Sequence, residues 1–119
     1  MPERTQQWPS DLVLVRHGES RRNVQSRLAH QLGLTEYGDG MRQADIPLTA
    51  TGIRQAEETG QYLARFHFYR VVVSPYLRAV QTAELITRQF PYQAEVRYEE
   101  RVREREVGIF DALTRTGIA

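Results

Sequence analysis

The sequence contains no cysteine and no lysine, and it has no long apolar run. The lack of cysteine excludes disulfides, thiolate catalysis and cysteine-ligated metals. No segment reaches the length of a signal-peptide core or a membrane span, so we expect a cytoplasmic protein with no membrane partner. All sixteen basic residues are arginine. This bias suits phosphate binding, but codon bias is the simpler explanation, and most of these arginines should lie on a solvated surface.

The formal net charge is only +1, and no basic block or aromatic-interleaved patch is present. These features give no support to a nucleic-acid partner. A chain of 119 residues can form one domain with a real core. Residues 1–10 are polar and predict a flexible N-terminal arm, and residues 11–119 should form the folded part.

An apolar run, Leu12 to Val15, leads directly into the charged sequence Arg-His-Gly-Glu-Ser at residues 16–20. Four consecutive apolar residues predict a short strand that is buried on both faces, as in a parallel sheet. Ligand sites in such sheets lie at the carboxyl ends of the strands, where Arg16 and His17 would emerge. By itself, a single histidine is more often a structural residue than a catalytic one.

The rest of the chain alternates between helical and strand patterns. We expect a short helix over 23–29, a helix from Thr49 or Thr51 to about residue 66, a strand at 71–73, a helix that Ser74-Pro75 starts and Pro91 ends, and a parallel strand at 94–98. Gly60 should provide a close contact between its helix and the sheet. The glycine-rich stretch within 24–45 reads as a loop that either shapes substrate choice or is neutral surface.

Three ordered motifs resemble the histidine phosphatase superfamily, whose members are phosphoglycerate mutase-like. They are Arg-His-Gly-Glu-Ser with Asn23 three residues on, Leu-Thr-Ala-Thr-Gly-Ile-Arg-Gln-Ala at 48–56, and Ser-Pro-Tyr-Leu-Arg-Ala-Val-Gln-Thr-Ala at 74–83. The resemblance covers nearly the whole chain from about Asp11. It implies an α/β fold of three layers, α/β/α, with a mainly parallel sheet.

The resemblance also implies the roles of individual residues. His17 would be the nucleophile that forms a phosphohistidine without metal or cofactor, and Glu104 would be the catalytic acid, ahead of its neighbours Glu100 and Glu106. Arg16 and Arg78 would bind phosphate through their guanidinium groups, with help from the Asn23 amide. His30 and His67 match no motif. The substrate implied is a small phosphorylated molecule.

Two features of the resemblance leave alternatives open. The mutases carry tyrosine where this chain has Val107, which favours a phosphatase over phosphoglycerate mutase-type transfer. The second histidine of the family, in a later His-Gly turn, has no counterpart here, so we expect a truncated domain with weak or no activity alone. Its open sheet edge and exposed apolar face should favour self-association or pairing with a missing C-terminal half. The competing class is a non-catalytic phosphate-binding or interaction module.

Overall fold

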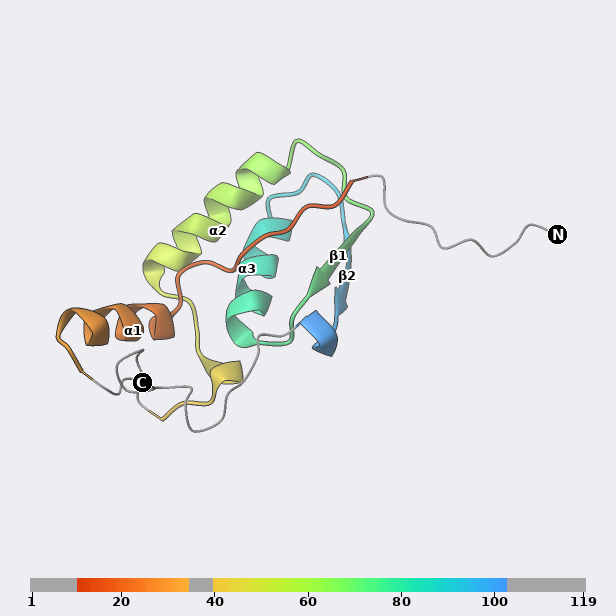
Figure 1. The fold of residues 1–119 in the computed structure, drawn as a ribbon. Coiled ribbons are helices and arrows are strands. Elements are labelled where there is room, and N and C mark those ends of the chain that lie inside the picture. The colour runs from red at the N-terminus through yellow and green to blue at the C-terminus, as the bar shows by residue number, and fades with distance from the viewer. Residues whose placement is uncertain (1–10, 35–39, 103–119) are drawn as a thin grey trace.

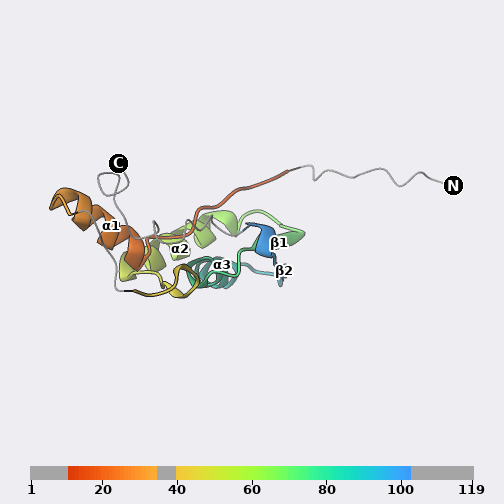
Figure 2. The same ribbon diagram turned by 60° about the horizontal axis from the view of Figure 1, so that its bottom comes forward.

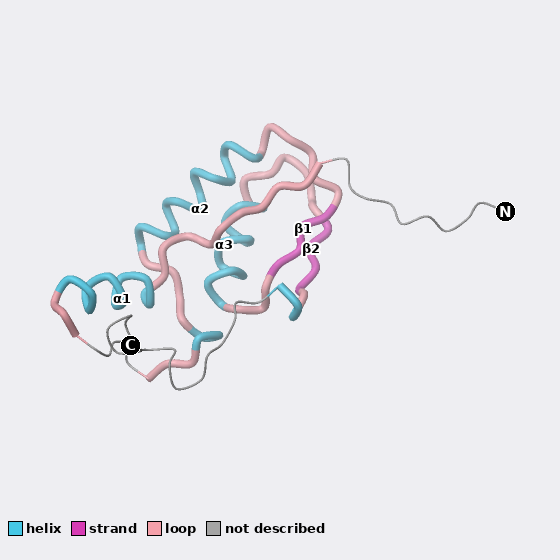
Figure 3. Tube along the Cα trace, in the orientation of Figure 1, coloured by secondary structure: helices cyan, strands magenta, loops and turns pink. Residues whose placement is uncertain are grey.

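The structure, a computed structural model, describes residues 11–34 and 40–102. Its elements in chain order are α1 (Arg21–Gln31), the 3-10 helix η1 (Gln43–Asp45), α2 (Ala50–Leu63), β1 (Arg70–Val73), α3 (Leu77–Thr87), β2 (Glu95–Tyr98) and the 3-10 helix η2 (Glu100–Val102). Figure 1 shows α2 and α3 beside the two strands, with α1 at the far end from them, and Figure 3 shows the same trace by secondary structure. The predicted arm at 1–10 lies outside the described residues.

The two strands form a parallel sheet with α3 as the crossover between them. Arg70 lies opposite Glu95 and Val73 lies opposite Tyr98. Parallel neighbours need a connection of this length, usually a helix, because the chain must return to the same end of the sheet. The predicted strands at 71–73 and 94–98 are therefore confirmed, as is the parallel pairing.

The first predicted strand, by contrast, is wrong. Leu12 to Val15 is not paired with any strand, and Leu12 and Leu14 are 74% and 86% exposed. In Figure 1 this segment runs from the end of the grey N-terminal trace toward α1. The described sheet is only two strands wide. An apolar run is buried as a strand only where neighbouring strands pair with its edges, and neither described strand pairs with this segment.

Helices α2 and α3 pack closely on one another, and α3 also contacts β1. Figure 2, which turns the molecule by 60°, shows α2 and α3 still side by side. A Cβ atom at Gly60 would lie 2.9 Å from the Cα of Ile86 and 2.8 Å from the Cγ of Gln89. The predicted close contact at Gly60 is therefore real, but its partner is α3 rather than the sheet.

The start of α3 also differs from the prediction. The helix begins at Leu77, and Tyr76 holds the capping position without a side-chain hydrogen bond. The Ser74 hydroxyl instead accepts the Tyr76 N–H at 3.3 Å, so this serine closes a local turn one step before the helix. The other helices agree better, because α1 and α2 cover most of their predicted ranges and Thr49 is the cap of α2.

The buried apolar core comes from several elements and the loops between them. Its members are Ala29, Ile46, Leu48, Ala56, Leu63, Val73, Tyr76 and Ile86. The apolar side chains of Val72, Val96 and Tyr98 remain exposed, as the sequence predicts for an open sheet, while association stays a prediction. Within the described part of the chain, no helix is long and apolar enough to cross a membrane.

Replacing Gly60 with alanine tests the contact between α2 and α3. Overpacking of this kind costs about 1–3 kcal/mol, whereas the better helix propensity of alanine returns at most about 1 kcal/mol. We expect Gly60→Ala to lower the midpoint of urea unfolding. Gln61→Ala, at the exposed neighbouring position, should leave that midpoint almost unchanged. Equal or greater stability of Gly60→Ala would contradict the close packing described here.

Candidate active site

The backbone of the histidine loop, residues 17–20, lies directly against the start of α2. A Cβ atom at Gly18 would clash with the carbonyl group of Gly52, and one at Gly52 would clash with the backbone of Glu19. Neither glycine can be replaced without moving one of these backbones. The glycines of the first two motifs are therefore explained by a single close approach between them.

Side chains from α2 and α3 bind the peptide groups of this loop. The Gly18 N–H donates to the Thr82 hydroxyl at 3.1 Å, and the Glu19 N–H donates to the Gln55 side-chain oxygen at 2.8 Å. One residue further on, Ser20 forms an isolated antiparallel bridge with Leu48. The loop thus has hydrogen-bond partners on α2, on α3 and in the segment that precedes α2.

The His17 side chain is half-buried, and its ring is held by the loop itself. Its Nδ1 atom lies 2.6 Å from the carbonyl oxygen of Gly18. A carbonyl oxygen only accepts hydrogen bonds, so this contact assigns the proton to Nδ1. In the neutral ring the lone pair is then on Nε2.

Arg78 lies in the first turn of α3 and is buried, with 3% of its surface exposed. Its Nη1 group donates to the carbonyl oxygen of Gln43 at 2.6 Å, and its guanidinium carbon lies 4.8 Å from the centre of the Tyr76 ring. Gln43 belongs to η1, within the stretch at 24–45 that the sequence predicts to be a loop. This stretch therefore contacts the candidate phosphate-binding arginine directly.

The remaining predicted site residues are less closely assembled. Arg16 is exposed and makes no hydrogen bond or ion pair with any residue in the described part of the chain. The Asn23 side-chain oxygen accepts the N–H of Ser20 at 2.9 Å and the Ser20 hydroxyl at 3.0 Å, in a capping box at the start of α1. Glu104 and Glu106 lie outside the described residues.

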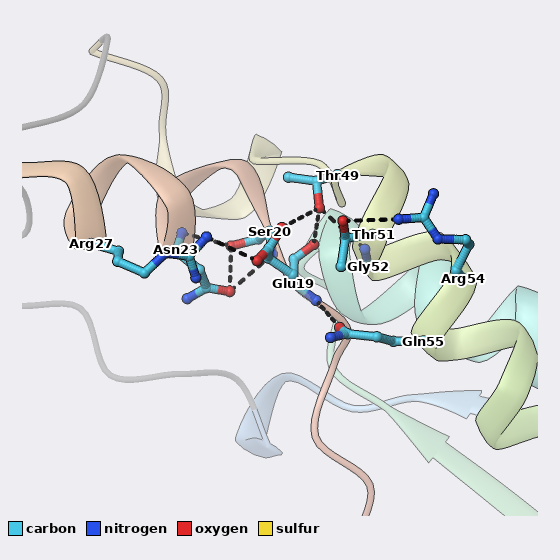
Figure 4. Close-up of polar contacts among 9 residues, drawn as sticks. All are labelled: Glu19, Ser20, Asn23, Arg27, Thr49, Thr51, Gly52, Arg54 and Gln55. Carbon is cyan, nitrogen blue, oxygen red and sulfur yellow. Dashed lines mark hydrogen bonds and ion pairs between the residues drawn. The ribbon is translucent and has the colours of Figure 1, made fainter.

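Glu19 is at the centre of a polar network that links α1 to α2 (Figure 4). Its carboxylate accepts a hydrogen bond from the Thr49 hydroxyl at 2.8 Å and pairs with Arg27 at 3.2 Å. The Thr49 hydrogen bond is the largest cause of the lowered pKa of Glu19; burial opposes it, and the hydrogen bond and charge of Arg27 lower the pKa further. Thr49 also accepts the Gly52 N–H at 3.1 Å and so caps α2.

Sequence reasoning missed the residues that hold the loop. Thr82 and Gln55 stand inside the quoted motifs, but only their types and positions are visible in the sequence, not their bonds to Gly18 and Glu19. Arg22 is an exception to the expectation that most of the arginines lie on a solvated surface. It is 8% exposed and donates to the carbonyl oxygen of Met41 at 3.2 Å. Among the described residues, no three histidine or acidic side chains gather as metal ligands would.

Comparison with known proteins assigns the class. The model of the histidine phosphatase superfamily (branch 1) matches residues 12–119, so the chain belongs to this superfamily. The chain is 44% identical over 75 residues to the uncharacterized phosphatase PhoE of Bacillus subtilis, covering 63% of the chain and 33% of PhoE. It is 36% identical over 99 residues to the fructose-2,6-bisphosphatase TIGAR of Xenopus laevis, covering 82% of the chain and 32% of TIGAR.

Solved structures give the same result for the fold. A mycobacterial glucosyl-3-phosphoglycerate phosphatase in complex with VO3 matches with a TM-score of 0.65 at 26% identity, over 86% of this chain and 42% of that one. The phosphoserine phosphatase of Entamoeba histolytica matches with a TM-score of 0.62 at 26% identity, over 86% and 43% of the two chains. The predicted phosphoglycerate mutase-like α/β class is confirmed. The chain spans about a third of the length of the two curated relatives described above.

The network around Glu19 predicts a specific effect of Thr49→Val. The substitution removes the cap of α2, which typically costs about 1 kcal/mol. It also removes the main cause of the lowered Glu19 pKa, which should rise toward its ordinary value of 4.5. The ionised carboxylate stabilises the folded state above the unfolded pKa, and this contribution is lost as the pH falls through the folded pKa.

Two measurements check this prediction. Urea unfolding should show a loss of stability at pH 7 that becomes smaller in acid, and NMR titration of the Glu19 carboxyl carbon should show the raised pKa. Thr51→Val is the matched control, because the Thr51 hydroxyl accepts only an exposed Arg54 N–H at 3.2 Å among the described contacts. An unchanged Glu19 titration in Thr49→Val would show that the Thr49 hydroxyl does not set this pKa.

Proposed function

We propose that this chain provides the nucleophilic half of a metal-independent phosphomonoester phosphatase that works through phospho-His17. The observation that carries the proposal is the contact between His17 Nδ1 and the Gly18 carbonyl oxygen. A ring held in this tautomer directs its basic nitrogen, Nε2, away from the loop that binds Nδ1. A neutral imidazole so oriented can attack phosphorus without first losing a proton.

The proposed reaction has two steps. His17 Nε2 forms a bond to phosphorus while the bond from phosphorus to the ester oxygen breaks, and the leaving oxygen takes a proton from the Glu104 carboxyl group. Water then attacks the phosphohistidine, Glu104 takes a proton from that water, and the bond from nitrogen to phosphorus breaks. Inorganic phosphate and the original His17 are restored.

We assign to the arginines the stabilisation of negative charge on the phosphoryl oxygens. Phosphoryl transfer depends chiefly on positioning and on cationic donors around the equatorial oxygens. Arg78 is well suited to this task, because its first-turn position in α3 adds the positive end of the helix dipole to its own charge. We assign Arg16 and the Asn23 amide supporting contacts to the same phosphate.

The place of Glu104 in the chain supports its assignment as the acid. The carboxyl ends of parallel strands meet at one edge of a sheet. β1 leads from that edge into the turn before Arg78, and β2 leads from it into η2, shortly before Glu104. The relatives described above, which include a fructose-2,6-bisphosphatase and a phosphoserine phosphatase, support a small phosphate ester as the substrate class.

We expect the activity of this chain to be weak. Its three histidines include only one that precedes a glycine, His17, so the second His-Gly turn implied by the resemblance has no counterpart in the sequence. Loss of one donor from a site that stabilises developing charge typically costs about 10²–10³ in rate. A sensitive assay is therefore required.

The first test is hydrolysis of p-nitrophenyl phosphate by this chain with a metal chelator present. We expect slow, chelator-insensitive release of phosphate, with His17→Ala at least about 100-fold slower because the nucleophile is absent. His30→Ala is the matched control, since His30 is exposed on α1 and contacts Ser26 rather than the loop. Trapped protein should carry acid-labile phosphate on His17, detectable by ³¹P NMR.

Other outcomes identify the competing functions. Binding of vanadate without hydrolysis or phosphohistidine would indicate a non-catalytic phosphate-binding module. Transfer of the phosphoryl group to another hydroxyl without release of phosphate would indicate a mutase. Hydrolysis that is unaffected by His17→Ala would contradict the proposed mechanism.

Glu104→Gln tests the acid separately from the nucleophile. A general acid contributes about 10²–10⁴ in rate, and most where the leaving group is a poor one. We expect this variant to lose far more activity on β-glycerophosphate than on p-nitrophenyl phosphate, whose leaving group needs little protonation. Glu100→Gln and Glu106→Gln are controls that should affect both substrates equally and little. A larger selective loss in either control would move the acid to that residue.

A further inference from the structure

The Thr82 hydroxyl occupies an unusual place between two of the site's motifs. It is buried, with the residue 5% exposed, and it makes two hydrogen bonds. It accepts the N–H of Gly18 at 3.1 Å and donates to the carbonyl oxygen of Arg78 at 2.7 Å. The single hydroxyl proton is committed to Arg78, so a lone pair of the oxygen is aimed at Gly18.

These two bonds connect residues that are far apart in the sequence. Gly18 directly follows His17, and its carbonyl oxygen accepts the hydrogen bond from His17 Nδ1. Arg78 begins the turn of α3 that ends at Thr82. The neighbouring peptide group of the loop, the Glu19 N–H, bonds to Gln55 on α2 instead. Thr82 therefore ties the loop to the helix that carries Arg78.

We propose that Thr82 is a positioning residue for the reaction at His17, and this inference rests on the proposed function. Thr82 acts through Gly18 and Arg78 and touches no reacting atom. It sets the distance between the His17 nucleophile and the Arg78 guanidinium, which stabilises the charge on the phosphoryl group. Displacement of a reacting group by about 1 Å can cost about 10² in rate, so a bond that fixes this distance affects turnover more than binding.

Thr82→Val and Thr82→Ser separate the hydroxyl from the shape of the side chain. Valine keeps the branched shape and removes both hydrogen bonds, whereas serine keeps the hydroxyl. We expect Thr82→Val to lower kcat by about 10–100-fold with a much smaller change in KM, and Thr82→Ser to restore most of the activity. Hydrogen exchange of the Gly18 amide, followed by NMR, should become faster in Thr82→Val and stay slow in Thr82→Ser.

Thr87→Val is the matched control on the same helix. The Thr87 hydroxyl also donates to the carbonyl oxygen four residues earlier, that of Ala83 at 2.9 Å, but its described bonds do not reach the histidine loop. It should leave kcat, KM and the Gly18 exchange rate unchanged. If valine at position 82 prevents folding, Thr82→Ala removes the same hydroxyl without the branched bulk and replaces it in every comparison.

The proposal is overturned if the hydroxyl-free variant at position 82 folds and keeps the wild-type kcat, if Thr82→Ser loses as much activity as Thr82→Val, or if Thr87→Val has the same effect. Absence of turnover in the wild-type chain would count against the proposed function alone. Vanadate affinity of the same variants then decides the role of Thr82, because vanadate takes the five-coordinate geometry of the transition state and so reports the alignment that KM does not. Binding about tenfold weaker in Thr82→Val than in Thr87→Val supports positioning, and equal binding overturns it.

Discussion

The close approach of two backbones, that of Gly18 and Glu19 and that of Gly52, is the constraint on which the site depends. Because neither glycine has a Cβ, the histidine loop can lie directly against the first turn of α2. The loop's peptide groups then come within reach of side chains on two helices. Gln55 binds one N–H from α2, and Thr82 binds the preceding one from α3. A larger residue at either glycine position would separate the loop from the Gln55 and Thr82 side chains. The structure of the site would be disturbed before its chemistry.

This constraint explains why hydrogen bonds are concentrated around so short a loop. A loop that leaves an extended segment has N–H groups without a ladder to receive them, and buried groups of this kind need partners. Here one hydroxyl and one amide satisfy two successive peptide groups, and the Gly18 carbonyl oxygen binds the His17 ring. Glu19 adds an electrostatic tie, because its carboxylate joins Thr49 of the α2 cap to Arg27 of α1. The loop is therefore fixed by its own surroundings.

Much of the fold could be predicted from local patterns. Apolar spacing indicated α2, the run at 71–73 indicated β1, and alternation at 94–98 indicated β2, because each signal belongs to the segment that carries it. The strand predicted at Leu12 to Val15 is wrong for the opposite reason, since burial of a strand depends on neighbours that the segment does not encode. Gly60 was correctly read as a packing contact, but no sequence pattern could tell that Ile86 of α3, rather than a strand, would be its partner.

The same distinction applies to the site. The motifs identified His17 and Arg78 through the chemistry of their side chains, whereas Thr82 and Gln55 have side chains that serve many structural purposes. Only the three-dimensional arrangement shows that these two side chains bind the histidine loop. Arg78 illustrates this most clearly, because its charge was visible in the sequence, but its burial and its bond to Gln43 were not. A buried guanidinium needs strong acceptors to offset its desolvation. The carbonyl group of Gln43 in η1 supplies one of them, so the stretch at 24–45, for which the sequence left a role in substrate choice and a neutral surface loop both open, supports a predicted phosphate ligand.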